Sequence, residues 1–382
     1  MTETSRFLLH CVLIEGIGPA VVSKLLGAIS NENLPQIYDW SVSDCKFKAG
    51  LNERVATMLV AGLQNTEPLE RELSLISKYN VSWITRIDPL FPEPLGHIHL
   101  PPTGLFVRGA LPRDPGIAFV GSRTAGAYAR RSIEPMIGHL VDTGWSIVSG
   151  GALGVDTMAH AATLSSGGQT VVVLGSGLLR PYPQSNRKLF ANVIQSGGAV
   201  VSAFPLEMEA LAAHFPARNR IIAGLSQGCV VVRAAQRSGA LITAKFAMQE
   251  GREVFAIPGM IDDPLSAGCH AIIQEGAQLI HTVSDICREL AGTCNCWQKT
   301  KNKTTTAAQR KNKPAIAKQI PLPFVVSADD PEIVRLCMKP VSTDALVEAL
   351  GRTLDDIQAE LLELQLEGRV EQSVSGLWQR AR

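Results

Sequence analysis

The sequence predicts an α/β protein with a central doubly wound, Rossmann-like, mostly parallel sheet, a small helical domain before it and a helical tail after it. Two observations support the central sheet. Short and almost continuously apolar runs alternate with stretches of helical length between about residues 100 and 290. These runs are bounded by Gly, Ser or Pro, as is usual for strands buried on both faces of a parallel sheet.

Six runs are expected to be strands and three stretches to be crossover helices. Repetition of strand, helix and strand in this order is typical of a doubly wound sheet. The strands are expected at 117–120, 146–148, 170–174, 199–201, 228–232 and 254–257, and the helices at 127–142, 155–165 and 239–249.

Changes in composition divide the chain of 382 residues into four parts. We expect a helical domain at 1–75, a Rossmann-like core at 76–290, a basic flexible linker at 291–328 and a winged-helix-like domain at 329–382. The linker has too little apolar surface to order itself, so we interpret it as a solubilising tether that can also touch phosphate nonspecifically. It holds no Asp or Glu, and its basic residues are Lys299, Lys301, Lys303, Arg310, Lys311, Lys313 and Lys318.

Composition excludes some classes of protein. The net charge of +1 neither favours nor excludes a nucleic-acid partner, so any electrostatic binding surface must be local. Residues 1–10 lack the pattern of a signal peptide, and no run of about 18 apolar residues occurs. The eight cysteines are scattered, as expected for reduced thiols. We therefore expect a cytoplasmic protein with no membrane association.

Polar and glycine residues follow nearly every expected strand. In doubly wound sheets, ligands bind beyond the carboxyl ends of the strands. Glycine permits close backbone approach, helix N-termini favour anions, and an arginine fork suits phosphate. One such loop alone would be only a tight turn, but the whole set predicts a phosphate-binding rim. The set comprises Gly121, Ser122, Arg123 and Thr124, Ser149 and Gly150, Gly175 to Gly177, Ser238 and Gly239, and Pro258 and Gly259.

No nucleotide-binding or catalytic pattern accompanies this rim. A Walker A loop is absent, and the nearest dinucleotide fingerprint, at 175–180, lacks its third glycine. Asp156 and His160 are four residues apart without a paired nucleophile, so we expect Asp156 to stabilise a helix start and His160 to be a packed or surface residue. We expect no catalysis and no cofactor.

A metal site is also not expected. Cys287, Cys294 and Cys296, with His281 nearby, are the only group that could suggest one. Their spacing fits structural zinc sites poorly, which favours free thiols at a domain edge.

Residues 214–226 form the most distinctive segment. Phe215 stands beside Arg218 and Arg220, and an aromatic ring with two guanidinium groups suits a single nucleic-acid strand. Because these two arginines cannot share one helix face, both can be exposed only near a helix start. The equally weighted alternative is that Phe215 is core and the arginines form ion pairs.

Several motifs together resemble the DprA/Smf family of bacterial DNA-processing proteins. No single motif is decisive, but their order and spacing match over roughly residues 70–290. They are 118–123, 148–150 with 154–156 and 159–160, 173–177, Tyr182 and Pro183 with Asn186, 215–226, 238–244 and 251–259.

This resemblance implies a function. It implies a Rossmann-like domain that binds single-stranded DNA, usually as a homodimer, loads the RecA recombinase and protects DNA taken up in natural transformation. Family members are not known as enzymes. The positions implied for DNA contact are Gly121, Ser122, Arg123, Ser149, Gly150, Arg218, Asn219, Arg220, Ser238 and Gly239, with Lys245 a weaker candidate; Thr124 and Phe215 complete our candidate set.

The sequence departs from the family pattern at three positions. Leu153 stands where the family often has a basic residue, so one phosphate contact is expected to be missing. Ala203 and Arg233 stand where the family usually has acids. We expect the last two changes to make the local potential more positive, which favours DNA.

The flanking regions resemble small helical modules. Residues 13–19 resemble a helix-hairpin-helix, whose turn can offer amides to a phosphate, and a helix-packing module of the sterile-alpha-motif type is weighted equally. The tail resembles the family's winged helix, with Ser342 in a cap before a helix that begins near Asp344. Its last helix is acidic, so we expect it to bind protein rather than duplex DNA.

Two further classes of function stay open at this point. One is a nucleotide-processing Rossmann enzyme such as a phosphoribohydrolase, although the P-G-G-x-G-T-x-x-E segment usual in that class is absent. The other is an interaction scaffold that no longer binds DNA. Release of a free base from a nucleoside monophosphate would identify the enzyme, and absence of both activities would leave the scaffold.

Overall fold

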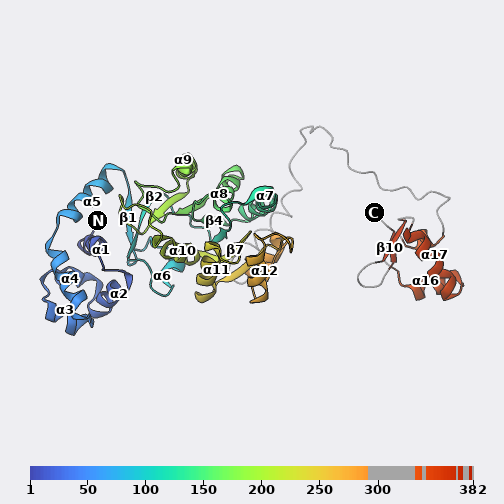
Figure 1. Cartoon of the computed structure of the whole chain (residues 1–382), viewed down its shortest axis with the longest axis horizontal. Coiled ribbons are helices and arrows are strands. Elements are labelled where there is room, and N and C mark those ends of the chain that lie inside the picture. The colour runs from blue at the N-terminus through green and yellow to red at the C-terminus, as the bar shows by residue number, and fades with distance from the viewer. Residues whose placement is uncertain (291–331, 338–340, 367–368, 373–377, 381–382) are drawn as a thin grey trace, which may run out of the picture. The chain divides into compact units, whose positions relative to one another are not determined.

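The structure is a computed structural model that describes residues 1–290, 332–337, 341–366, 369–372 and 378–380. It contains two compact units, Met1–Gln309 and Arg310–Arg382 (Figure 1). The basic segment expected to be a linker lies outside the described residues. Among the described residues, no helix is long and apolar enough to cross a membrane.

The first unit begins with helices that have their own core. Phe7, Leu25 and Leu59 are fully buried in it. Leu9 instead packs with Trp83 and Phe106, which ties the helical region to the edge of the sheet. The elements are α1 (Glu3–Leu13), α2 (Pro19–Ala28), η1 (Asn31–Asp39), α3 (Val42–Ala49), α4 (Glu53–Gln64) and α5 (Glu67–Lys78).

A nine-stranded sheet in the order β1-β2-β6-β5-β4-β3-β7-β8-β9 forms the centre of this unit. The strands from β6 to β9 in this order are parallel, while β1 and β2 are antiparallel to their neighbours. The predicted fold class is confirmed, and all six expected strands are present. The bounds are β1 (Ser82–Thr85), β2 (Gly104–Gly109), β3 (Gly116–Val120), β4 (Ser146–Ser149), β5 (Thr170–Val173), β6 (Ala199–Ser202), β7 (Ser226–Val231), β8 (Glu253–Ala256) and β9 (Gln278–Leu279).

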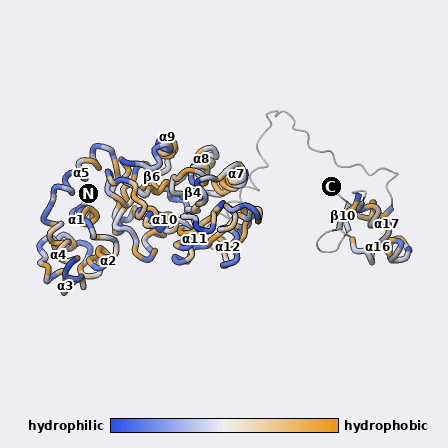
Figure 2. Tube along the Cα trace, in the orientation of Figure 1, coloured by the Kyte–Doolittle hydropathy of each residue, from blue (hydrophilic) through white to orange (hydrophobic). Residues whose placement is uncertain are grey.

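Helices cover both faces of the sheet because alternate strand residues point to opposite sides. Ile117 and Phe119 of β3 pack against α7, α8 and α13, whereas Ala118 and Val120 face α10, α11 and α12. Figure 2 shows hydrophobic segments inside this domain, flanked by hydrophilic loops. The bounds are α6 (Glu93–Gly96), α7 (Gly126–Asp142), α8 (Val155–Ser165), η2 (Gln184–Asn186), α9 (Arg187–Gln195), α10 (His214–Gly224), α11 (Gly239–Gln249), α12 (Ala267–Gln274) and α13 (Val283–Glu289).

The second unit is a small domain with a separate core. Ile333, Leu346, Ile357 and Trp378 are buried in it. Ser342 accepts a hydrogen bond from the Ala345 amide at 3.2 Å, which confirms the expected cap. The described elements are α15 (Glu332–Leu336), α16 (Thr343–Leu350), α17 (Leu354–Leu366) and the antiparallel pair β10 (Val370–Gln372) and β11 (Trp378–Arg380).

Candidate nucleic-acid interface

One pocket of about 340 Å³ lies at the carboxyl ends of β3, β4 and β7. Three loops and the starts of α10 and α11 form its walls. The structure therefore brings most of the sequence-predicted residues together. Those that line the pocket are Gly121, Ser122, Arg123, Phe215, Arg218, Asn219, Ser238 and Gly239.

The loops approach one another closely because glycines face neighbouring backbone. A Cβ on Gly154, whose φ is +80°, would lie 2.3 Å from the Ser122 carbonyl oxygen. The Val155 amide donates to that carbonyl at 3.1 Å, and the Ser122 amide donates to the carbonyl of Arg233 at 2.7 Å. Three strand ends are thus joined by backbone hydrogen bonds, which holds the pocket in shape.

Arg218 is buried and holds the pocket in shape through hydrogen bonds to two backbone carbonyls. Its side chain is 5% exposed, and Nη1 donates to the Gly150 carbonyl and, at 2.6 Å, to the Val173 carbonyl. Burial lowers the pKa of Arg218, and the charge of Asp156 opposes that shift. Burial likewise raises the pKa of Asp156, which Arg218 opposes. The two opposite charges therefore stabilise each other in a site with little water.

Of the two equally weighted interpretations of residues 214–226, the one with Arg218 and Arg220 both exposed near a helix start is wrong. The helix α10 begins at His214, so Arg218 lies in its second turn and points towards the strand ends. Arg220 is half-buried outside the pocket, and its Nε has no hydrogen-bond partner among the described residues. The Nη1 and Nε atoms of Arg218 are engaged by the two carbonyls and by the Asn219 side chain, which gives Arg218 first a role in holding the pocket together.

Phe215 lines the pocket with two guanidinium groups close to its ring. Its ring centroid is 5.8 Å from Cζ of Arg123 and 5.6 Å from Cζ of Arg218, both cation–π distances. The ring of Tyr182 meets it edge-on with the centroids 6.0 Å apart. Because Phe215 is only half-buried, it is not a core residue, and Arg123 beside it is exposed.

Other expected site residues have local structural roles. Ser149 is fully buried and its hydroxyl donates to the Phe119 carbonyl at 2.7 Å. Ser238 caps α11. Gly150 is buried behind the pocket, whereas Thr124 and Lys245 are exposed outside its lining. A DNA contact through the Ser149 side chain is therefore ruled out, because its hydroxyl is inaccessible and already bonded.

The two residues considered for catalysis are also engaged. Asp156 accepts from the Ala152 amide at 3.1 Å near the start of α8, as expected for a helix-stabilising role. His160 is fully buried, with Nδ1 2.7 Å from the Thr170 hydroxyl. Burial lowers its pKa to about 3, so the ring is neutral at physiological pH. His160 does not line the pocket, whereas Asp156 does, with its carboxylate held by the Ala152 amide and by the charge of Arg218.

Arg233 raises the local potential less than expected. Its Nη1 donates to the Ala125 carbonyl at 2.8 Å, and its Nη2 forms an ion pair with Asp263. Asp263 supplies a negative charge thirty residues further along the chain, which offsets the arginine. The change from the family's acid is thus largely neutralised, and the expected gain in DNA attraction is reduced.

Tyr182 was not among the residues expected at the site, although its position after β5, the third of the expected strands, could have indicated it. Among the described residues no group of three or more metal-binding side chains occurs, and Cys294 and Cys296 lie outside them.

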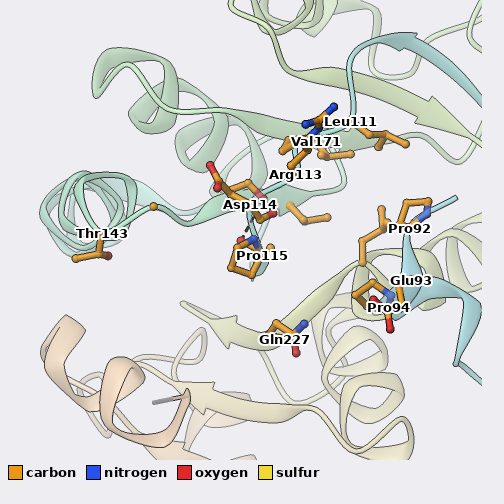
Figure 3. Close-up of a pocket in the computed structure, with 16 residues that line it drawn as sticks. Pro92, Glu93, Pro94, Leu111, Arg113, Asp114, Pro115, Thr143, Val171 and Gln227 are labelled. Atoms are coloured by element: carbon orange, nitrogen blue, oxygen red, sulfur yellow. Dashed lines mark hydrogen bonds between the residues drawn. The ribbon is translucent and has the colours of Figure 1, made fainter. Parts of the chain in front are cut away.

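A larger pocket of about 550 Å³ lies at the opposite, amino ends of the parallel strands (Figure 3). Gln227 and Thr143 line it, together with Arg113 and the acids Glu93 and Asp114. Its lining contains two acids against one base and no aromatic ring, so it is poorly suited to a nucleic acid. The charges and residue types of the linings, rather than the volumes, therefore favour the smaller pocket as the nucleic-acid site.

Comparison with known proteins identifies relatives of the chain. Residues 82–291 match the family of DNA recombination-mediator protein A, and residues 335–376 match the DprA winged helix domain. The DNA processing protein DprA of Streptococcus pneumoniae is 45% identical over 205 residues, which cover 53% of this chain and 72% of that protein. Protein Smf of Synechocystis is 30% identical over 389 residues, covering 96% of each chain. The X-ray structure of the Streptococcus pneumoniae protein superposes with a TM-score of 0.65 and 36% identity, covering 76% of this chain and 98% of that one.

Proposed function

The chain belongs to the DprA/Smf family of DNA-processing proteins, and from this premise we propose that it binds single-stranded DNA in the pocket at the carboxyl ends of β3, β4 and β7. The observation that carries the proposal is the position of Phe215 beside both Arg123 and Arg218. A base can stack on the ring while the exposed Arg123 contacts the neighbouring phosphate.

The pocket suits a single strand better than a duplex. A base reaches the face of an aromatic side chain only when it is unstacked, which costs little in a single strand. The backbone amides of the glycine loops add donors for phosphate oxygens. Binding of this kind is tolerant of sequence because every base offers a flat face.

Replacing Arg123 with alanine is expected to weaken binding of a fluorescent oligothymidylate about tenfold. Loss of one phosphate contact should also reduce the slope of log K against log salt by about 0.7. Fluorescence anisotropy at several salt concentrations measures both quantities. Arg131→Ala is the matched control, because Arg131 is an exposed arginine of α7 that does not line the pocket. Equal effects of the two substitutions would refute a specific role for Arg123.

In this proposal the bound strand is handed to the RecA recombinase, in the cytoplasm, during DNA uptake and recombination. The family resemblance supports this step, and the protein would act without catalysing a reaction. Stimulation of RecA filament formation on single-stranded DNA should be reduced in the Arg123→Ala protein to the extent that DNA binding is reduced. Full stimulation by a variant that no longer binds DNA would argue against the handover.

A homodimer is the proposed form of the protein. Met260 and Ile261 are 72% and 97% exposed on the loop after β8, and Leu279 is 43% exposed on the edge strand β9. Apolar side chains and an open strand edge together favour coverage by a second copy. Ile261→Asp is expected to shift the protein to monomers in sedimentation velocity, with Glu275→Asp at the exposed end of α12 as a conservative control. An unchanged dimer would move the interface elsewhere.

A further inference from the structure

A groove adjoins the proposed DNA pocket. Two neighbouring cavities of about 320 and 590 Å³ share Leu179, Pro181 and Arg187 in their linings, and we refer to them together as the groove beside α9. Tyr182 lines the first cavity, and its ring meets that of Phe215 in the DNA pocket. The groove therefore begins where the proposed site ends.

Unpaired positive charge lines this groove. Arg180 and Arg187 are exposed, and Arg108 is half-buried at its far part. No salt bridge involves any of the three within the part of the chain that the structure describes. Glu209 is the acid in the lining. The charge balance favours an anionic occupant.

The backbone holds these arginines in place. The Gly177 amide donates to the Met208 carbonyl at 2.8 Å, and the Leu179 amide donates to that of Leu206 at 2.9 Å, so the loop before Arg180 is fixed at two points. Just before Arg187, the Asn186 side chain donates to the Gly151 carbonyl at 2.9 Å. Gly151 belongs to the loop after β4, which ties the start of α9 directly to the DNA pocket.

We propose that a bound single strand leaves the pocket across Tyr182 and continues through this groove, with successive phosphates facing Arg180 and Arg187. This inference rests on the proposed function and adds a path to it. The lining also includes the exposed ring of Tyr79, which gives a surface for the face of a base. Continuity from Phe215 through Tyr182 favours DNA over an acidic peptide, which would not need the aromatic link.

The test compares oligothymidylates of about 5 and about 20 nucleotides, since only the longer one can fill both sites. The double variant Arg180→Ala/Arg187→Ala should bind the long strand at least about tenfold more weakly and the short strand as the wild type does. The salt slope for the long strand should fall by about 0.7 for each arginine removed. Arg187→Lys should keep most of the affinity, and Lys188→Ala, at an exposed neighbour outside both cavities, should change nothing.

The outcomes separate the two proposals. If the double variant binds the long strand as tightly as the wild type does, the path through the groove is wrong, and an acidic protein segment becomes its better occupant. If Arg123→Ala has no effect while the double variant loses the long strand, the groove binds DNA by itself, and both the pocket proposal and the path that starts from the pocket are wrong. Equal losses for short and long strands would also overturn the inference, because the arginines would then act within the pocket.

Discussion

Replacing Arg218 with alanine is expected to lower the free energy of unfolding by about 3–5 kcal/mol. Arg218 is 5% exposed, and its guanidinium bonds the carbonyls that end β4 and β5. The substitution leaves these acceptors unsatisfied and the buried Asp156 without its compensating charge. It should therefore act on stability first and on DNA binding through collapse of the pocket.

Denaturant unfolding followed by circular dichroism measures this effect. Arg123→Ala is the matched control, because its side chain is exposed and its loss should leave stability unchanged. Adding Asp156→Asn to Arg218→Ala should recover part of the loss, since it removes the uncompensated carboxylate. A fully stable Arg218→Ala protein that fails to bind DNA would instead make Arg218 a direct ligand.

Phe215→Ala is expected to have the largest effect on DNA affinity, about 1–3 kcal/mol or roughly 5- to 150-fold. The substitution removes the stacking surface and also the ring that contacts the guanidinium groups of Arg123 and Arg218. Anisotropy with an oligothymidylate measures the loss. The ring is only half-buried, so the variant should fold.

Phe215→Trp separates stacking from packing, because it keeps a flat aromatic face. This variant should bind within a few-fold of the wild type. If Phe215→Ala binds normally while Arg123→Ala does not, the site recognises phosphate alone, and the stacking part of the proposal is wrong.

The central sheet could be predicted because its strands are buried on both faces and are nearly continuously apolar. The edge strand β9, of only two residues, was missed. The edge strand β1 and its neighbour β2 were missed as well. They are antiparallel, and β1 has only four residues, of which Ser82 is exposed and Ile84 only partly buried. A short strand with a mixed pattern is not separable from a helical segment by periodicity alone. The two segments are strands because they pair with each other and with β6, which their local sequence does not show.

The site residues that directly follow a strand could be predicted from the sequence. Gly121, Ser122 and Arg123 follow directly from the position of β3. The role of Arg218 was not predictable, because it depends on α10 starting at His214, before Pro216. The ion pair that offsets the charge of Arg233 could not be predicted either, since its partner Asp263 lies in a loop thirty residues further along the chain. Tertiary contacts decide such roles, and spacing in the sequence does not show them.

The most direct measurement is photo-crosslinking of the full-length protein to an oligonucleotide that contains 5-iodouracil, with the crosslinked peptides identified by mass spectrometry. Stacking of a base at the pocket predicts crosslinks to Phe215 and Tyr182, which are lost at high salt together with binding. Crosslinks confined to the basic segment at 291–328 or to the C-terminal domain, with the pocket unlabelled, would contradict the account.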